Sequence, residues 1–170
     1  ANADKVRMVG FIVLLGLVFF ALTVANNMIR PFYTKFGEEA FSLTTMELSW
    51  LFLLPNALAI AAMPLIRRLC VPGKIPVVFA IGIAAMTTGL LMQGMAEGLV
   101  VHAVGRALYG LFLTITLASL DVLLFDQSSG RELHLYYSFI VAFQNAGELV
   151  SPVAASAIAR SMDLSATFIG

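Results

Sequence analysis

The chain has 170 residues, of which 60% are hydrophobic and 12% are charged, with ten basic and ten acidic side chains. A water-soluble domain usually carries about 25% charged residues, and half that share cannot cover a water-facing surface. The zero net charge leaves no electrostatic footprint for nucleic acid, and the single cysteine, Cys70, excludes a disulfide framework or a thiolate metal cluster. The composition therefore predicts an integral membrane protein and excludes a soluble enzyme or a nucleic-acid-binding protein.

Continuous apolar stretches follow one another along the sequence. A bilayer core about 30 Å thick needs about 20 apolar residues in a helix. The runs are continuous rather than alternating, which favours helices over a β-barrel. We predict an all-α bundle with five complete membrane spans, at residues 8–29, 48–66, 75–95, 99–120 and 134–159, and the start of a sixth near Leu164. Because the chain begins without Met and ends inside an apolar segment, we expect a fragment of a larger protein.

Basic residues in the connections predict the orientation. By the positive-inside rule, the side with more Lys and Arg faces the cytoplasm. Six basic residues fall on the side of the N-terminus and three on the other, so we place the N-terminus in the cytoplasm. The cytoplasmic set is Lys5, Arg7, Arg67, Arg68, Lys74 and Arg131, and the opposite set is Arg30, Lys35 and Arg160. The short connection at residues 95–99 predicts that the third and fourth spans form a tight antiparallel hairpin.

Two charged residues lie deep inside predicted spans. Arg106 lies about 10 Å from the outer end of the fourth span and Glu148 about 16 Å from the outer end of the fifth, at 1.5 Å per residue. A charge at bilayer depth usually faces a cavity or a partner. One interpretation is a buried ion pair that only fixes helix packing. The interpretation that we favour is a pathway for a substrate or for protons, since such residues tend to mark pathways.

The fifth span carries its small and polar residues on one helical face. Gly147, Ser151 and Ala155 recur every four residues, which allows close approach of another helix. Pro152 removes a backbone hydrogen bond and can bend the helix. The face therefore predicts a cavity lining, a kinked packing surface, or both in different halves. We predict neither a metal site nor a cofactor, because His102 and His134 are separated by most of the membrane thickness.

Two helical motifs resemble those of the major facilitator superfamily of transporters. The fourth-span sequence GRALYGLFL is similar to the family's fourth-helix arginine motif, with Arg106 and Gly110 matching. Tyr109 and Phe112 replace the usual glutamine and second glycine. The fifth-span sequence GELVSPVAAS is similar to the antiporter motif, with Gly147 and Pro152 matching and small substitutes at Ser151, Ala155 and Ser156.

Two further segments extend the resemblance in the same order along the chain. TVANNMIRP, at the end of the first span, is similar to the first-helix motif of drug–proton antiporters, although Ala21 stands where that motif has an aspartate. RRLCVPGK is similar to the family's cytoplasmic signature loop through Arg68, Gly73 and Lys74, with Val71 in place of its aspartate. The arginine and antiporter motifs favour the N-terminal half of such a transporter.

The resemblance implies one half of a twelve-helix secondary transporter, with solute bound between the two halves. We expect proton-coupled movement of a small organic solute, with export favoured, in a bacterial inner membrane. Glu148 would exchange a proton, and Arg106 would tune the pKa of Glu148 or attract an anionic group. Hydrogen bonds to the solute would come from Asn26, Asn27, Asn56, Tyr109, Gln144 and Asn145.

The competing hypothesis is a membrane sensor or scaffold that keeps the same bundle without transporting anything. A second six-helix half would favour transport, whereas a fused signalling domain would favour sensing. We do not expect an enzyme, since the sequence offers no Ser/His pair at one depth, no metal-ligand cluster and no nucleotide-binding loop.

Overall fold

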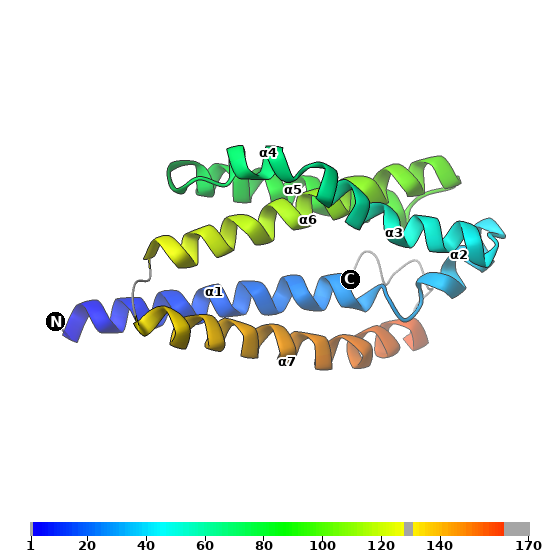
Figure 1. Cartoon of the computed structure of the whole chain (residues 1–170). Helices are drawn as coiled ribbons and strands as arrows, with labels where there is room; N and C mark the ends of the chain where they lie inside the picture. The colour runs from blue at the N-terminus through cyan, green and yellow to red at the C-terminus, as the bar shows by residue number, and fades with distance from the viewer. Residues whose placement is uncertain (1, 128–130, 162–170) are drawn as a thin grey trace.

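The structure is a bundle of α-helices. The computed structural model describes residues 2–127 and 131–161, and no β-strand occurs within those ranges. This confirms the all-helical prediction. The long helices are α1 (Asn2–Met28), α5 (Ile75–Gly94), α6 (Leu99–Gln127) and α7 (Arg131–Ser161), and the short elements are α2 (Tyr33–Phe41), α3 (Thr45–Ala61), α4 (Met63–Leu69) and the 3-10 turn η1 (Pro72–Lys74) (Figure 1).

Three helical segments in the described residues are long and apolar enough to cross a membrane. They are Lys5–Met28, Pro72–Gly94 and Leu99–Gln127, which agree with the first, third and fourth predicted spans. The last of these continues beyond the predicted end at residue 120. A bent pair, α3 and α4, raises the number to four if the pair is counted as one span. The predicted set of five complete spans is therefore not confirmed.

The second predicted span, 48–66, is broken rather than continuous. It begins after a capping box, in which the Thr44 backbone N–H donates to Glu47 Oε2 at 2.8 Å and the Thr44 hydroxyl accepts from the Glu47 backbone N–H. α3 ends at Ala61, and α4 leaves at an angle of 56°. Pro64, in the first turn of α4, has no N–H to donate, and its ring clashes with the carbonyl four residues earlier. This proline accounts for the break.

The fifth predicted span, 134–159, lies within a continuous helix, α7, which runs past Pro152 to Ser161. α7 is not among the helices that qualify as candidate spans. Gln144, Asn145 and Glu148 lie near its middle and reduce its apolar character. The predicted start of a sixth span at Leu164 lies outside the described residues.

Glycines hold α5 and α6 in close contact, which confirms the predicted hairpin. A Cβ atom on Gly89 would lie 2.7 Å from the Tyr109 backbone N, and one on Gly105 would lie 2.8 Å from the Gly89 carbonyl oxygen. On the next face of α6, a Cβ atom on Gly110 would lie 2.7 Å from Pro55 Cα. α6 therefore packs closely on α5 and α3 at adjacent points of one segment.

Small residues also join α7 to α1. A Cβ atom on Gly147 would lie 3.0 Å from the Phe20 carbonyl oxygen, and Ser151 and Ala155 have no exposed surface. The Ser151 hydroxyl donates to the Gly147 carbonyl, so its polar group is satisfied within the helix. The predicted small-residue series on the fifth span is therefore a packing face against α1.

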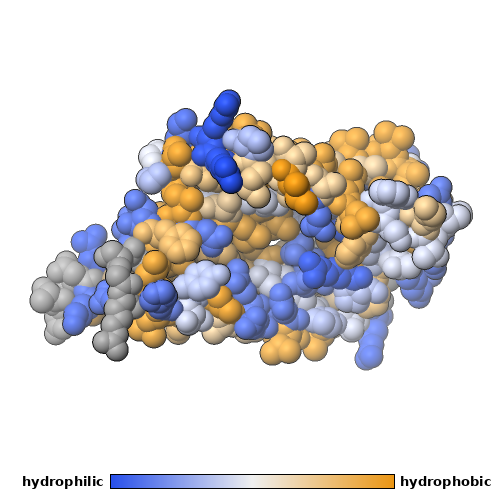
Figure 2. All heavy atoms as spheres, in the orientation of Figure 1, coloured by the Kyte–Doolittle hydropathy of each residue, from blue (hydrophilic) through white to orange (hydrophobic). Residues whose placement is uncertain are grey.

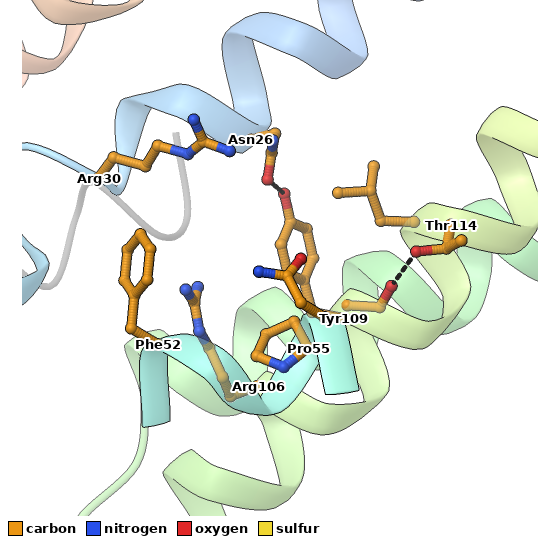
Figure 3. Close-up of a pocket in the computed structure, with 10 residues that line it drawn as sticks. Asn26, Arg30, Phe52, Pro55, Arg106, Tyr109 and Thr114 are labelled. Atoms are coloured by element: carbon orange, nitrogen blue, oxygen red, sulfur yellow. Dashed lines mark hydrogen bonds between the residues drawn. The ribbon is translucent and has the colours of Figure 1, made fainter. Parts of the chain in front are cut away.

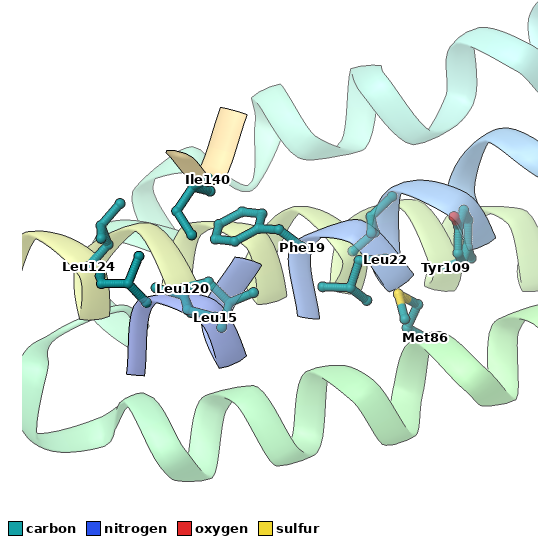
Figure 4. Close-up of a cluster of buried hydrophobic side chains, with 10 residues drawn as sticks. Leu15, Phe19, Leu22, Met86, Tyr109, Leu120, Leu124 and Ile140 are labelled. Carbon is teal, nitrogen blue, oxygen red and sulfur yellow. The ribbon is translucent and has the colours of Figure 1, made fainter. Parts of the chain in front are cut away.

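Large apolar side chains fill the space between the α1–α7 pair and the α5–α6 pair. Leu15 from α1 lies beside Leu120 from α6, and Leu22 from α1 lies beside Met86 from α5 (Figure 4). Phe19 from α1 and Ile140 from α7 complete the cluster near Leu124. Leu124 is completely buried. In lipid, which is as apolar as these side chains, close van der Waals packing stabilises helix contacts, so this cluster joins the two helix pairs.

Many large apolar side chains are exposed on the long helices. Figure 2 shows hydrophobic side chains spread over the face of the molecule that it draws. Large apolar residues are exposed on several helices, among them Leu14 on α1, Val77 on α5, Val100 on α6 and Leu149 on α7. Exposed apolar surface on this scale is typical of an interaction with lipid or with a partner.

The basic residues of the predicted cytoplasmic side gather at one end of the bundle. The N-terminus of α1, the α4–α5 connection and the start of α7 lie at the same end in Figure 1. Arg67 and Arg68 end α4, and Lys74 follows in η1. This arrangement agrees with the assignment of successive connections to alternate sides of the membrane, from which the orientation is predicted.

Replacement of Gly89 by Ala tests the close contact between α5 and α6. We expect the free energy of unfolding in mixed micelles to fall by about 1–3 kcal/mol, because the new methyl group meets backbone atoms that cannot move aside easily. Gly10→Ala is the matched control, since nothing lies within 4 Å of a Cβ atom there. That control should leave stability unchanged or raise it slightly. Equal effects of the two variants would contradict the packing described here.

Candidate functional site

A polar pocket of about 90 Å³ lies between the end of α1, the middle of α3 and the first half of α6 (Figure 3). Its volume is sufficient for water molecules or for a small polar group. It brings together four of the residues predicted to lie on a solute or proton pathway, namely Asn26, Asn56, Arg106 and Tyr109. The complete lining is Asn26, Arg30, Phe52, Pro55, Asn56, Arg106, Tyr109, Gly110, Leu113 and Thr114.

Helical spacing explains which residues of each helix reach the pocket. Residues three or four apart share a face of an α-helix. On α6 this face carries Arg106, Tyr109, Gly110 and Leu113. Gly110 also allows Pro55 to approach α6 closely, so the packing contact and the pocket wall are parts of one feature.

Arg106 is the buried charge of the pocket. Only 7% of its surface is exposed, and its Nε atom has no hydrogen-bond partner among the described residues. The guanidinium carbon lies 4.4 Å from the centre of the Tyr33 ring and 5.6 Å from that of Phe52. Such cation–π contacts are worth about 0.5–2 kcal/mol, which is less than the several kcal/mol that burial of an ion costs. The rings therefore orient the cation without compensating fully for its burial.

No acidic residue balances Arg106 in the described part of the pocket lining. Tyr33 is the nearest ionisable ring, and burial raises its pKa while the positive charge of Arg106 acts in the opposite direction. The phenol therefore stays neutral near pH 7 and supplies no negative charge. Arg30 adds a second cation to the lining and is exposed, so the pocket is electropositive.

Tyr109 and Asn26 form a hydrogen bond between α6 and α1. The Tyr109 hydroxyl donates to Asn26 Oδ1 at 2.9 Å (Figure 3). The amide oxygen of Asn26 is thereby occupied, and its two N–H donors remain for another group. On the opposite wall, the Thr114 hydroxyl donates to the Gly110 carbonyl at 3.0 Å.

Four of the predicted pathway residues are not brought to the pocket. Glu148 and Asn145 are exposed on α7, Gln144 is half-buried there, and none of the three lines the pocket. The predicted meeting of Arg106 and Glu148 does not occur in the described residues. α7 packs on α1 through Gly147, and the next residue along a helix points about 100° away. The Asn27 amide donates to the Thr23 carbonyl at 3.0 Å, within its own helix.

The residues that resemble a cytoplasmic signature loop do not line the pocket. Arg68 belongs to the last turn of α4, and Gly73 and Lys74 form part of η1. All three are exposed. Their contribution in this structure is positive charge at one end of the bundle.

Sequence reasoning missed Arg30, Phe52 and Thr114 as members of the site. Arg30 belongs to the connection that follows α1, two residues beyond the end of the helix, and its side chain reaches the pocket from there. Phe52 precedes Asn56 by four residues on α3 and shares its helical face. This spacing was available in the sequence, but the convergence of three helices on one point was not.

Comparisons of the chain with models of known families, with curated proteins and with solved structures found no match. The apolar helices are consistent with a membrane protein.

Replacement of Arg106 by Met separates a structural role from a functional one. Met is apolar and of similar length, so the cost of burying an unbalanced cation disappears along with the cation–π contacts. We expect the free energy of unfolding to stay within about 1 kcal/mol of the unsubstituted protein or to rise.

Unfolding in mixed micelles measures this effect. Leu124→Ala is the control for sensitivity, because truncation of this fully buried side chain should cost about 2–5 kcal/mol. A loss of similar size in Arg106→Met would show that Arg106 is held for stability.

Proposed function

We propose that the chain is one half of a secondary active transporter of the major facilitator type, which moves a small organic solute across a membrane. The observation that carries this proposal is the pocket in which the buried Arg106 meets Asn26 and Asn56 from two other helices. Charged residues inside membrane helices are costly, and they commonly mark the paths of substrates and ions.

The depth of the pocket supports a role in transport. Arg106 is seven residues from the start of α6, which corresponds to about 10 Å along the helix. Arg30 lies just beyond the end of α1 and is exposed. In the proposed orientation, with a cytoplasmic N-terminus, Arg30 would lie at the outer surface and Arg106 deeper in the membrane. An anion could contact the two cations in turn as it enters.

The remaining helices fit the proposed half-transporter. α7 lies alongside α1 in Figure 1 and, at 31 residues, is long enough to cross the same bilayer. Its exposed Glu148 would then need a cover other than lipid. In this proposal, a second half of the transporter provides that cover, in the bacterial inner membrane.

Proton coupling is the second part of the proposal. Glu148 is separate from the pocket, so proton exchange and solute binding would occur at different positions. α7 packs directly against α1, and α1 carries Asn26 and Arg30 of the pocket. A change in the charge of Glu148 would therefore act on the pocket through α1. Export is favoured by the likeness of the α7 sequence to the antiporter motif.

Glu148→Gln tests the coupling in the full-length protein. In vesicles that enclose a pH-sensitive dye, addition of a transported solute should move protons, and the variant should lose that movement while still inserting into the membrane. Glu97→Gln is the matched control, because Glu97 is an exposed acid in the α5–α6 connection.

The results separate the hypotheses. Unchanged proton movement in Glu148→Gln would remove Glu148 from the mechanism. If no member of a broad panel of organic anions, cations and neutral solutes crossed the membrane, the sensor or scaffold hypothesis would replace transport.

A further inference from the structure

Both charged groups of the pocket are cations. Arg106 and Arg30 have donors only, and no acidic residue is among the described lining residues. The neutral groups Asn26, Asn56, Tyr109 and Thr114 offer donors and acceptors but no negative charge. A ligand that complements this lining must therefore supply acceptors and negative charge.

Arg106 is prepared for such a ligand. Only 7% of its surface is exposed, it lines the pocket, and its buried Nε atom has no hydrogen-bond partner among the described residues. Tyr33 lies against the guanidinium face, which leaves the edge of the group for hydrogen bonds. The guanidinium edge presents paired N–H donors that match the two oxygens of a carboxylate or phosphate.

Arg30 lies at the solvent-exposed side of the same pocket. In Figure 3 the side chain of Arg106 extends into the region between Phe52 and Tyr109, and the side chain of Arg30 extends toward Asn26. Arg30 is exposed, whereas Arg106 is buried. An anion that enters the pocket would therefore first meet the hydrated guanidinium of Arg30 and then the dehydrated guanidinium of Arg106. Its charge-assisted hydrogen bond would be stronger with Arg106.

We infer that this pocket binds an oxyanion group, a carboxylate or a phosphate, of a small solute, with Arg106 as the inner cation and Arg30 as the outer one. The identification of the anion as part of a transported solute rests on the proposed transport function. The oxyanion-binding site itself does not depend on transport. At about 90 Å³, the pocket accommodates the anionic group alone, well below the 300–1,000 Å³ of a typical drug-sized ligand site. The rest of the solute would project through the open side.

Binding can be measured without transport. The full-length protein in phospholipid-free detergent is titrated with inorganic phosphate, acetate and succinate, and with choline and glycerol as cationic and neutral probes. The midpoint of thermal unfolding is the readout, since a ligand that binds only the folded state raises it. At constant ionic strength set with chloride, we expect at least one oxyanion to raise the midpoint and choline and glycerol to leave it unchanged.

Variants assign the effect to the pocket. Arg106→Gln should weaken the effective oxyanion by about 10- to 100-fold, the loss expected for a charge-assisted hydrogen bond. Arg106→Lys keeps the charge without the paired donors and should recover only part of the affinity. Arg30→Gln provides an independent test at an exposed residue that is not needed for packing. Arg160→Gln, an exposed arginine outside the pocket, is the matched control and should bind as the unsubstituted protein does.

The outcomes distinguish this inference from the proposed transport function. Oxyanion binding that depends on Arg106, in a protein that transports nothing, would support the inference and overturn transport. Transport of choline or a neutral solute that is unaffected by Arg106→Gln and Arg30→Gln would overturn the inference and leave transport standing. A thermal shift produced only by added phosphatidylglycerol would overturn the solute as the source of the anion, because the pocket would then bind a lipid headgroup.

Discussion

Close packing of α6 against two other helices is the constraint on which the site depends. Gly105 and Gly110 lie at the contacts with α5 and α3, and Arg106 and Tyr109 lie between them in the sequence. A side chain at either glycine would separate the helices, since backbone atoms of the neighbours already occupy the space. The same few residues therefore hold the bundle together and carry a charge into it.

That charge is the unusual element of the structure. A buried ion is normally paired or hydrogen-bonded to saturation, because desolvation costs several kcal/mol. Arg106 has aromatic rings instead of a carboxylate within the described residues, and its Nε atom is left without a partner. An unbalanced buried charge of this kind lowers stability, and such a cost is retained where function requires it. Under the proposed function, a bound anion would balance this charge.

Much of the fold followed from local pattern, whereas the assembly of the site did not. The lengths of the apolar stretches predicted α1, α5 and α6, and the five-residue connection predicted the hairpin of α5 and α6. The spacing of Gly147, Ser151 and Ala155 predicted a face for close helix packing. The break after Ala61 was not predicted because two prolines lie in that stretch, and α3 runs through Pro55 whereas Pro64 begins a new helix. Helical periodicity places residues on a face but does not identify the neighbouring helix. Periodicity therefore could not show that Asn26 and Asn56 line the same pocket as Arg106, or that Glu148 on α7 lies outside it.

An experimental structure of the full-length protein in lipid, at a resolution that shows ordered solvent, tests the central claim most directly. The account predicts that no Asp or Glu side chain from any part of the protein lies within 4 Å of the Arg106 guanidinium, the distance that defines an ion pair. Water or a bound anion should lie within hydrogen-bonding distance of the guanidinium group in the pocket. A carboxylate of the protein paired with Arg106 would contradict the account, because the charge would then be balanced internally and no ligand would be needed to explain it.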